Sequence, residues 1–125
     1  MATVRERGRA AARGKNDLRR LADALIAATN AFDVERALAV FAPDAVIDDP
    51  STGHRFDGHP GVRDYIERYF VGYRTVTRLL SIERLGPDRA RVRVDFTGGF
   101  GHEIGLLDMT AGEDGRIVHI DANLE

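Results

Sequence analysis

Three stretches of the chain repeat apolar residues every three or four positions, which predicts three amphipathic helices. The first covers residues 18–29. The second starts after Asp33, a suitable N-cap, carries Phe41 on its apolar stripe, and closes at Pro43, which disfavours helical geometry in the residue before it. The third starts at Pro60, because proline fits the first turn of a helix, and has an apolar, aromatic face.

Between and after these helices the pattern is that of strands and turns. Residues 45–48 are expected to form a short strand, and residues 50–59, rich in Pro, Ser, Gly and His, a loop. In the second half of the chain apolar and polar residues alternate, and Gly-containing turns interrupt the alternation. This pattern predicts four consecutive strands at residues 73–85, 90–96, 102–110 and 116–123.

The predicted order is α-α-β-α-β-β-β-β, which is typical of the α+β class, with helices packed on one face of an antiparallel sheet. A strongly curved sheet wrapped around helices encloses a cavity, and such a cavity is a usual place for a small ligand. The outer face of the sheet carries Ile104 and Leu106 if the alternation holds. A second copy of the chain is the simplest cover for that face, so we expect a homodimer.

Length, charge and cysteine content narrow the function classes. The 125 residues suit one domain, expected at 17–125, and no apolar run is long enough to cross a membrane. Without cysteine there are no disulfides or thiolate ligands, and the cytoplasm is the default compartment. Residues 1–16 form a basic leader that we interpret as a flexible, solvated arm, although such a segment can also touch nucleic acid or an anionic surface. Beyond residue 20 the chain carries a net charge of −7, which argues against nucleic acid as the main partner.

Several segments resemble the NTF2-like superfamily, and within it the SnoaL-like and ketosteroid-isomerase-like branch. The resemblance covers residues 17–125 and is carried by residues 33–38, 41–50, 56–62 and 114–118. It implies a cone in which three N-terminal helices pack on a strongly curved, mostly antiparallel sheet. Members of the superfamily include isomerases, polyketide cyclases, dehydratases, epoxide hydrolases and domains without catalytic activity, so the fold alone does not select the reaction.

The resemblance points to Asp49 as the main candidate catalytic residue. Asp49 is followed by Pro50, and in ketosteroid isomerases the aspartate directly before the corresponding proline is the general base. A carboxylate at a strand end beside an apolar pocket suits that role. Strand alternation places the neighbouring Asp48 on the opposite face. The two oxyanion donors of the isomerase correspond to Leu25 and Leu107, so both are missing here. The same alignment places Glu103 in the pocket, where a second carboxylate would act as an acid; the alternative is an exposed position at the strand entrance.

Two other side chains are candidate proton donors. Tyr65 can supply a phenol in place of the missing tyrosine, as can Tyr69 and Tyr73, although an aromatic core stripe explains all three as well. His54 lies in the loop expected at the cavity mouth. None of the four histidines has the spacing of a helical zinc site, so we expect neither a metal site nor a cofactor. The expected pocket walls are mostly apolar: Leu25, Phe41, Phe70, Val94, Phe96, Leu107, Met109 and Ile120.

The sequence supports an epoxide hydrolase less well than an enzyme with Asp49 as general base. Arg93 and Asp95 resemble the Arg-x-Asp pair of limonene epoxide hydrolases, but the third acid of that site falls on Ala122. An exposed cross-strand ion pair is the alternative interpretation of Arg93 and Asp95. The sequence therefore favours a cofactor-independent enzyme, an isomerase, cyclase or dehydratase, that acts on a hydrophobic carbonyl compound with Asp49 as base. The alternative is a non-catalytic NTF2-like domain that binds a ligand or dimerises.

Overall fold

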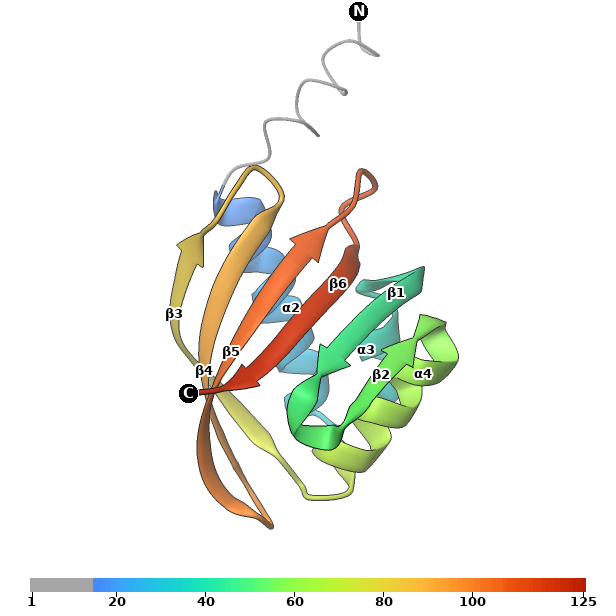
Figure 1. Ribbon diagram of the computed structural model, residues 1–125, viewed down its shortest axis with the longest axis vertical. Helices are drawn as coiled ribbons and strands as arrows, with labels where there is room; N and C mark the ends of the chain where they lie inside the picture. Colours follow the sequence, from blue (N-terminus) through green and yellow to red (C-terminus); the bar gives the residue numbers. More distant parts are fainter. Residues whose placement is uncertain (1–14) are drawn as a thin grey trace, which may run out of the picture.

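The computed structural model describes residues 15–125, which form helices and strands connected by short turns (Figure 1). The predicted basic leader lies outside the described residues, except for its last two residues, which begin the first helix. The helices are α2 (Lys15–Asn30), α3 (Val34–Leu38) and α4 (Gly58–Ile66), and α4 continues into the π-helical segment η2 (Glu67–Val71). The strands are β1 (Phe41–Asp49), β2 (His54–Asp57), β3 (Val76–Arg84), β4 (Arg89–Gly98), β5 (Gly101–Ala111) and β6 (Ile117–Leu124).

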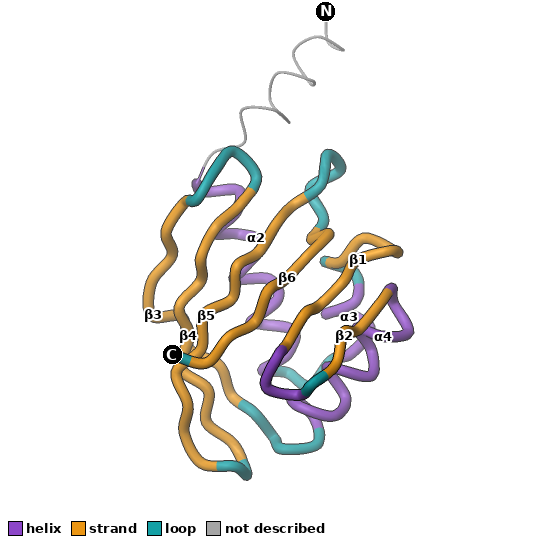
Figure 2. Tube along the Cα trace, in the orientation of Figure 1, coloured by secondary structure: helices purple, strands orange, loops and turns teal. Residues whose placement is uncertain are grey.

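The strands form one six-stranded sheet in the order β2-β1-β6-β5-β4-β3. Every neighbouring pair is antiparallel except β1 and β6, which are parallel, so the sheet is mixed but mostly antiparallel. The helices lie together behind the curved sheet in the view of Figure 2. The predicted α+β architecture is therefore confirmed.

The second predicted helix is shorter than its apolar stripe suggested. α3 ends at Leu38, and Phe41 belongs to β1, where its backbone pairs with Ile117. The register between β1 and β6 shifts between Phe41 and Val46, which accommodates Pro43 within the strand. Strand pairing thus wins over helical periodicity here, because the parallel neighbour β6 takes up the backbone hydrogen bonds of this segment.

The predicted loop at residues 50–59 contains regular structure. Pro50–Thr52 form a 3₁₀ turn (η1), and the four residues of β2 then pair antiparallel with the end of β1. A short, charged edge strand of this kind lacks the alternating apolar pattern that identifies a strand in sequence. The predicted strand at 73–85 begins later, at Val76, because η2 and the turn after it take up the preceding residues.

The hydrophobic core lies between the sheet and the helices. Leu18 of α2, Val62 of α4 and Val94 of β4 are fully buried there. The larger exposed apolar side chains include Tyr73, Phe100 and Leu124. Among the helices of the described part, none is both long and apolar enough to span a bilayer.

Candidate active site

Two adjoining cavities open between the sheet and the helices. The outer cavity has a volume of about 410 Å³, within the size range of small-molecule sites, and it combines aromatic walls with five polar residues: Asp49, Ser51, Thr52, Thr75 and Glu103. The inner cavity is almost entirely apolar and has a volume of only about 30 Å³, room for roughly one or two water molecules. The single apolar pocket expected from the sequence is therefore divided in two.

Three aromatic side chains line both cavities and separate them: Tyr65, Phe70 and Phe96. The rings of Phe70 and Phe96 meet edge to face with centroids 6.0 Å apart, and the Tyr65 and Phe70 ring centroids are 6.1 Å apart. We call these three residues the aromatic partition. Any ligand that occupies both cavities has to displace part of it.

Asp49 lies at the end of β1, and its side chain is fixed by three hydrogen bonds. The backbone N–H and the hydroxyl of Ser51 donate to Oδ1, at 3.0 and 2.6 Å. The phenol of Tyr65 donates to Oδ2 at 2.6 Å. Asp49 is followed by Pro50 and caps the short 3₁₀ turn, which is why Ser51 is within reach. With 9% of its surface exposed, Asp49 is buried but lines the outer cavity.

Tyr65 reaches Asp49 from α4 and sits within an aromatic cluster. Its ring centroid lies 5.0 Å from that of Phe56 and 5.2 Å from that of Tyr69. Burial raises the pKa of Tyr65 well above its ordinary value, and the nearby Asp49 carboxylate raises this pKa further. The phenol therefore keeps its proton at neutral pH, and Tyr65 acts as a hydrogen-bond donor rather than as a base.

The other two predicted catalytic residues lie in different places. Glu103, on β5 opposite Phe96, is exposed, yet it lines the same outer cavity as Asp49. Glu103 therefore occupies a position that is both pocket-lining and exposed, because the cavity is open to solvent at this residue. His54 is exposed on β2 and is not among the residues that line either cavity. It lies directly opposite Asp49 at the end of the β1–β2 pair, and its role as a proton donor stays a prediction.

Most of the predicted wall residues line the inner cavity: Leu25, Phe41, Phe70, Phe96, Leu107 and Ile120. Two do not. Val94 is completely buried in the hydrophobic core and lines neither cavity. Met109 faces a separate apolar gap of about 10 Å³ further along the sheet. The positions of the missing oxyanion donors, Leu25 and Leu107, both contribute to the inner cavity.

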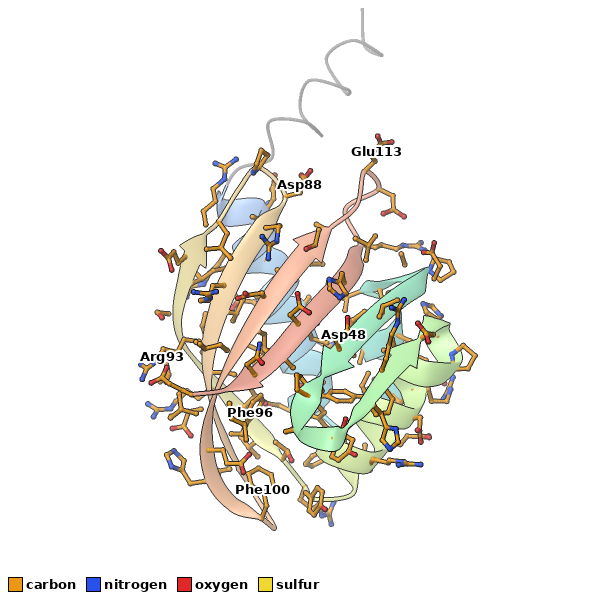
Figure 3. All side chains as sticks on the ribbon, in the orientation of Figure 1. Asp48, Asp88, Arg93, Phe96, Phe100 and Glu113 are labelled. Carbon is orange, nitrogen blue, oxygen red and sulfur yellow. The ribbon has the colours of Figure 1, made fainter. Side chains whose placement is uncertain are left out.

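Several residues of the outer cavity were missed in the sequence. Ser51 orients Asp49, and its position two residues after an aspartate is the pattern of an Asx turn, which could have identified it. Phe100, which the sequence did not indicate, extends the aromatic wall beside Tyr73, one of the three tyrosines already considered as donors, with ring centroids 5.7 Å apart. Figure 3 shows Phe96 and Phe100 toward the same end of the sheet. Phe100 comes from the turn between β4 and β5, and no local pattern indicates that this turn folds over the cavity.

The opposite face of the sheet carries ion pairs and a cluster of three possible metal-ligating side chains, Asp48, His119 and Asp121, whose ligand atoms lie within 4.8 Å of one another. Asp48, labelled in Figure 3, accepts a hydrogen bond from Nε2 of His119 at 2.8 Å, on the face away from Asp49. Arg93 does not pair with Asp95: it forms two 2.6 Å hydrogen bonds with Glu125, whereas Asp95 pairs with Arg78 at 2.9 Å. The cross-strand interpretation is thus confirmed, because Asp95 pairs with Arg78 directly opposite on β3 and Arg93 pairs with a residue outside β4; both remain outside the cavities.

The chemistry available in the outer cavity is that of carboxylates, phenols and hydroxyls. Among the described residues that line it, none is basic, so its charge comes from Asp49 and Glu103. Tyr69 also lines this cavity, and its hydroxyl makes no hydrogen bond to another described residue. The cavity thus brings together a positioned proton acceptor and a free phenolic donor.

The sequence profile of the SnoaL-like domain matches residues 22–120. The chain belongs to the SnoaL-like domain family. No curated protein gives a significant match to the sequence. The family assignment agrees with the NTF2-like resemblance of the sequence and with the curved mixed sheet.

Solved structures with the same fold include proteins linked to steroid and polyketide chemistry. A proposed ketosteroid isomerase from Kribbella flavida is 20% identical, with a TM-score of 0.76 over 88% of this chain and 78% of that one. A proposed polyketide cyclase from Sinorhizobium meliloti is 25% identical, with a TM-score of 0.75 over 82% and 93%. RV0760c from Mycobacterium tuberculosis, in complex with estradiol-17β-hemisuccinate, is 17% identical, with a TM-score of 0.73 over 84% and 91%.

Proposed function

We propose that this protein is a small-molecule enzyme that moves a proton at a carbon next to a carbonyl group, without a cofactor and with Asp49 as general base. One observation carries the proposal. Asp49 is buried, is held by Ser51 and Tyr65, and lines a cavity of about 410 Å³ with aromatic walls. A carboxylate fixed at the wall of such a cavity lies within reach of a bound substrate and can act as its general base.

The hydrogen bonds leave the carboxylate free to react at one oxygen. A carboxylate offers about two acceptor positions on each oxygen. Ser51 fills both positions on Oδ1, and Tyr65 fills one on Oδ2. The remaining position on Oδ2 can take the α-proton of a ketone, whose C–H electron pair then forms an enolate. Return of that proton from Asp49 to another carbon of the enolate completes an isomerisation.

The enolate needs a hydrogen-bond donor for its oxygen, and the free phenol of Tyr69 is the candidate in the outer cavity. Glu103, at the exposed side, is the candidate for exchanging a proton with solvent. Removal of one oxyanion donor in other enzymes lowers the rate by about 100- to 1,000-fold. We therefore expect a slower enzyme than one with two dedicated donors.

The cavity favours a flat, largely apolar substrate. Six aromatic side chains line the outer cavity: Tyr65, Tyr69, Phe70, Tyr73, Phe96 and Phe100. Two neighbours of the same fold, RV0760c with estradiol-17β-hemisuccinate and a computationally designed 17-OHP binder, support a ligand of steroid-like shape. Because Asp49 and Glu103 are the charged lining residues, an anionic group on the substrate has to point away from them.

Proton exchange tests the base without knowledge of the natural substrate. The ketone 2-tetralone is incubated with the protein in D₂O, and the loss of its α-protons is followed by NMR. Asp49→Asn should lower the protein-catalysed rate by about 100-fold or more. Asp48→Asn, an identical change one residue away on the opposite face, should leave the rate unchanged. Equal rates for wild type and Asp49→Asn would exclude Asp49 as the base.

A second candidate function is ligand binding without catalysis. The observation that favours it is the apolar character of Leu25 and Leu107, which line the inner cavity where the resemblance implies two donors. In that case 2-tetralone binds to wild type and to Asp49→Asn, but neither protein accelerates proton exchange. Calorimetric binding and exchange rates, measured on the same samples, distinguish the two functions.

A further inference from the structure

The inner cavity contains a hydroxyl group without a hydrogen-bond partner. Thr77 on β3 is 4% exposed and lines the inner cavity, and its Oγ1 has no partner among the described residues. The other threonine of this cavity, Thr29, differs in this respect, since its hydroxyl donates to the carbonyl of Ile26 at 3.2 Å. A buried hydroxyl without a partner destabilises the folded state, because it has lost its hydrogen bonds to water.

The backbone around Thr77 fixes the direction of this side chain. β3 is an edge strand, and the side chain of Asn30 pairs with both backbone groups of Thr77. Thr77 N–H donates to Asn30 Oδ1 at 2.7 Å, and Asn30 Nδ2 donates to the Thr77 carbonyl at 2.9 Å. Val76 is exposed and Thr77 buried, so strand alternation turns the Thr77 side chain inward. Directly across the strand pair lies Phe96 of the aromatic partition.

Neither packing nor local structure requires a hydroxyl at this position. Valine has nearly the same shape and would fill the same space without an unsatisfied polar atom. In a fold that otherwise satisfies its polar groups, a buried polar group without a hydrogen-bond partner is expected at a functional site. We infer that the hydroxyl of Thr77 binds an oxygen atom at the leading end of the ligand, an inference that rests on the proposed function of the two cavities.

The aromatic partition determines how a ligand reaches Thr77. The ring of Phe96 lies over Gly105, where an added Cβ would be 2.6 Å from Cε2 of that ring. Phe96 is half-buried and faces the open outer cavity as well as the inner one. Rotation of this ring joins the two cavities. The ligand class is therefore an elongated apolar molecule with a hydroxyl or carbonyl oxygen at the end that enters first.

The test compares two probes that differ in one group. The probes are 2-naphthol and 2-methylnaphthalene, whose hydroxyl and methyl groups have similar size, and calorimetry gives the affinity of each. Thr77→Val should reduce the preference for 2-naphthol over 2-methylnaphthalene by about tenfold, the effect of one lost hydrogen bond. Thr110→Val, a half-buried threonine that lines neither cavity, should leave the preference unchanged.

Thermal unfolding of the unliganded proteins gives an independent readout. Thr77→Val should melt at or above the wild-type temperature, because it removes an unsatisfied hydroxyl, whereas Thr29→Val should melt below it. An unchanged probe preference in Thr77→Val would overturn the inference, and would indicate a buried water as the only partner. Binding of 2-methylnaphthalene does not depend on the Thr77 hydroxyl. If wild type fails to bind 2-methylnaphthalene, that result counts against the proposed function of the cavities and not against the role of Thr77.

Discussion

The hydrogen bond from Tyr65 to Asp49 can be tested by removing one oxygen atom. Tyr65→Phe keeps the ring and its contacts with Phe56 and Phe70 but removes the donor that lies 2.6 Å from Oδ2. A hydrogen bond to a charged group contributes about 1.5–3 kcal/mol, more than a bond between neutral groups. Because both partners are buried or nearly so, we expect the variant to lose about 2 kcal/mol of its free energy of unfolding.

Thermal unfolding measures this loss. For a domain of this size, 2 kcal/mol corresponds to a fall in melting temperature of about 8 °C. Tyr69→Phe is the matched control, since it makes the same change in the neighbouring ring, whose hydroxyl has no hydrogen bond among the described residues. We expect that control to shift the melting temperature by less than about 2 °C.

A double-mutant cycle assigns the effect to the pair. Once Asp49→Asn has removed the carboxylate, the additional change Tyr65→Phe should be less costly than in the wild-type background by about 1 kcal/mol or more. Equal melting temperatures for Tyr65→Phe and Tyr69→Phe, or strictly additive effects in the cycle, would refute the Tyr65–Asp49 contact.

Two further predictions concern the ionisation of Tyr65 and the packing of Phe96. Burial raises the pKa of Tyr65 above the value of about 10 in an unfolded chain, so this group's contribution to stability is complete below pH 10 and is lost as the pH rises toward the higher folded-state pKa. An absorbance titration of the tyrosines should therefore show a late, alkaline step that Tyr65→Phe lacks, and its presence in that variant would contradict the assignment. Gly105→Ala forces the ring of Phe96 to move and should lower the free energy of unfolding by about 1–3 kcal/mol. Gly86→Ala, with open space around its added Cβ, should be neutral in the same denaturant titration, and a neutral Gly105→Ala would show that Phe96 does not occupy this space.

Much of the fold follows from the sequence because its longer elements are strongly periodic. α2 and the strands β4, β5 and β6 lie within a few residues of their predicted positions. The errors occur where tertiary pairing decides. Phe41 fits the apolar stripe of a helix as well as the pattern of a strand. It belongs to a strand because its backbone pairs with the parallel neighbour β6. The expected homodimer stays a prediction.

The candidate site was only partly predictable. Asp49 follows from the resemblance and from its place before a proline, and Tyr65 from its place on the aromatic face of a helix. Their direct contact depends on how α4 packs beside β1, which no local pattern encodes. The same holds for Thr77, because an unsatisfied hydroxyl can be recognised only when its surroundings are known.

A crystal structure of the protein with 2-tetralone bound would show whether Asp49 and the aromatic walls contact the same ligand. We expect the bicyclic ring to lie against Phe70 and Phe96, with the carbon next to the carbonyl within contact distance of Oδ2 of Asp49. A ligand bound elsewhere, or an Asp49 side chain turned toward bulk solvent in the complex, would contradict this expectation.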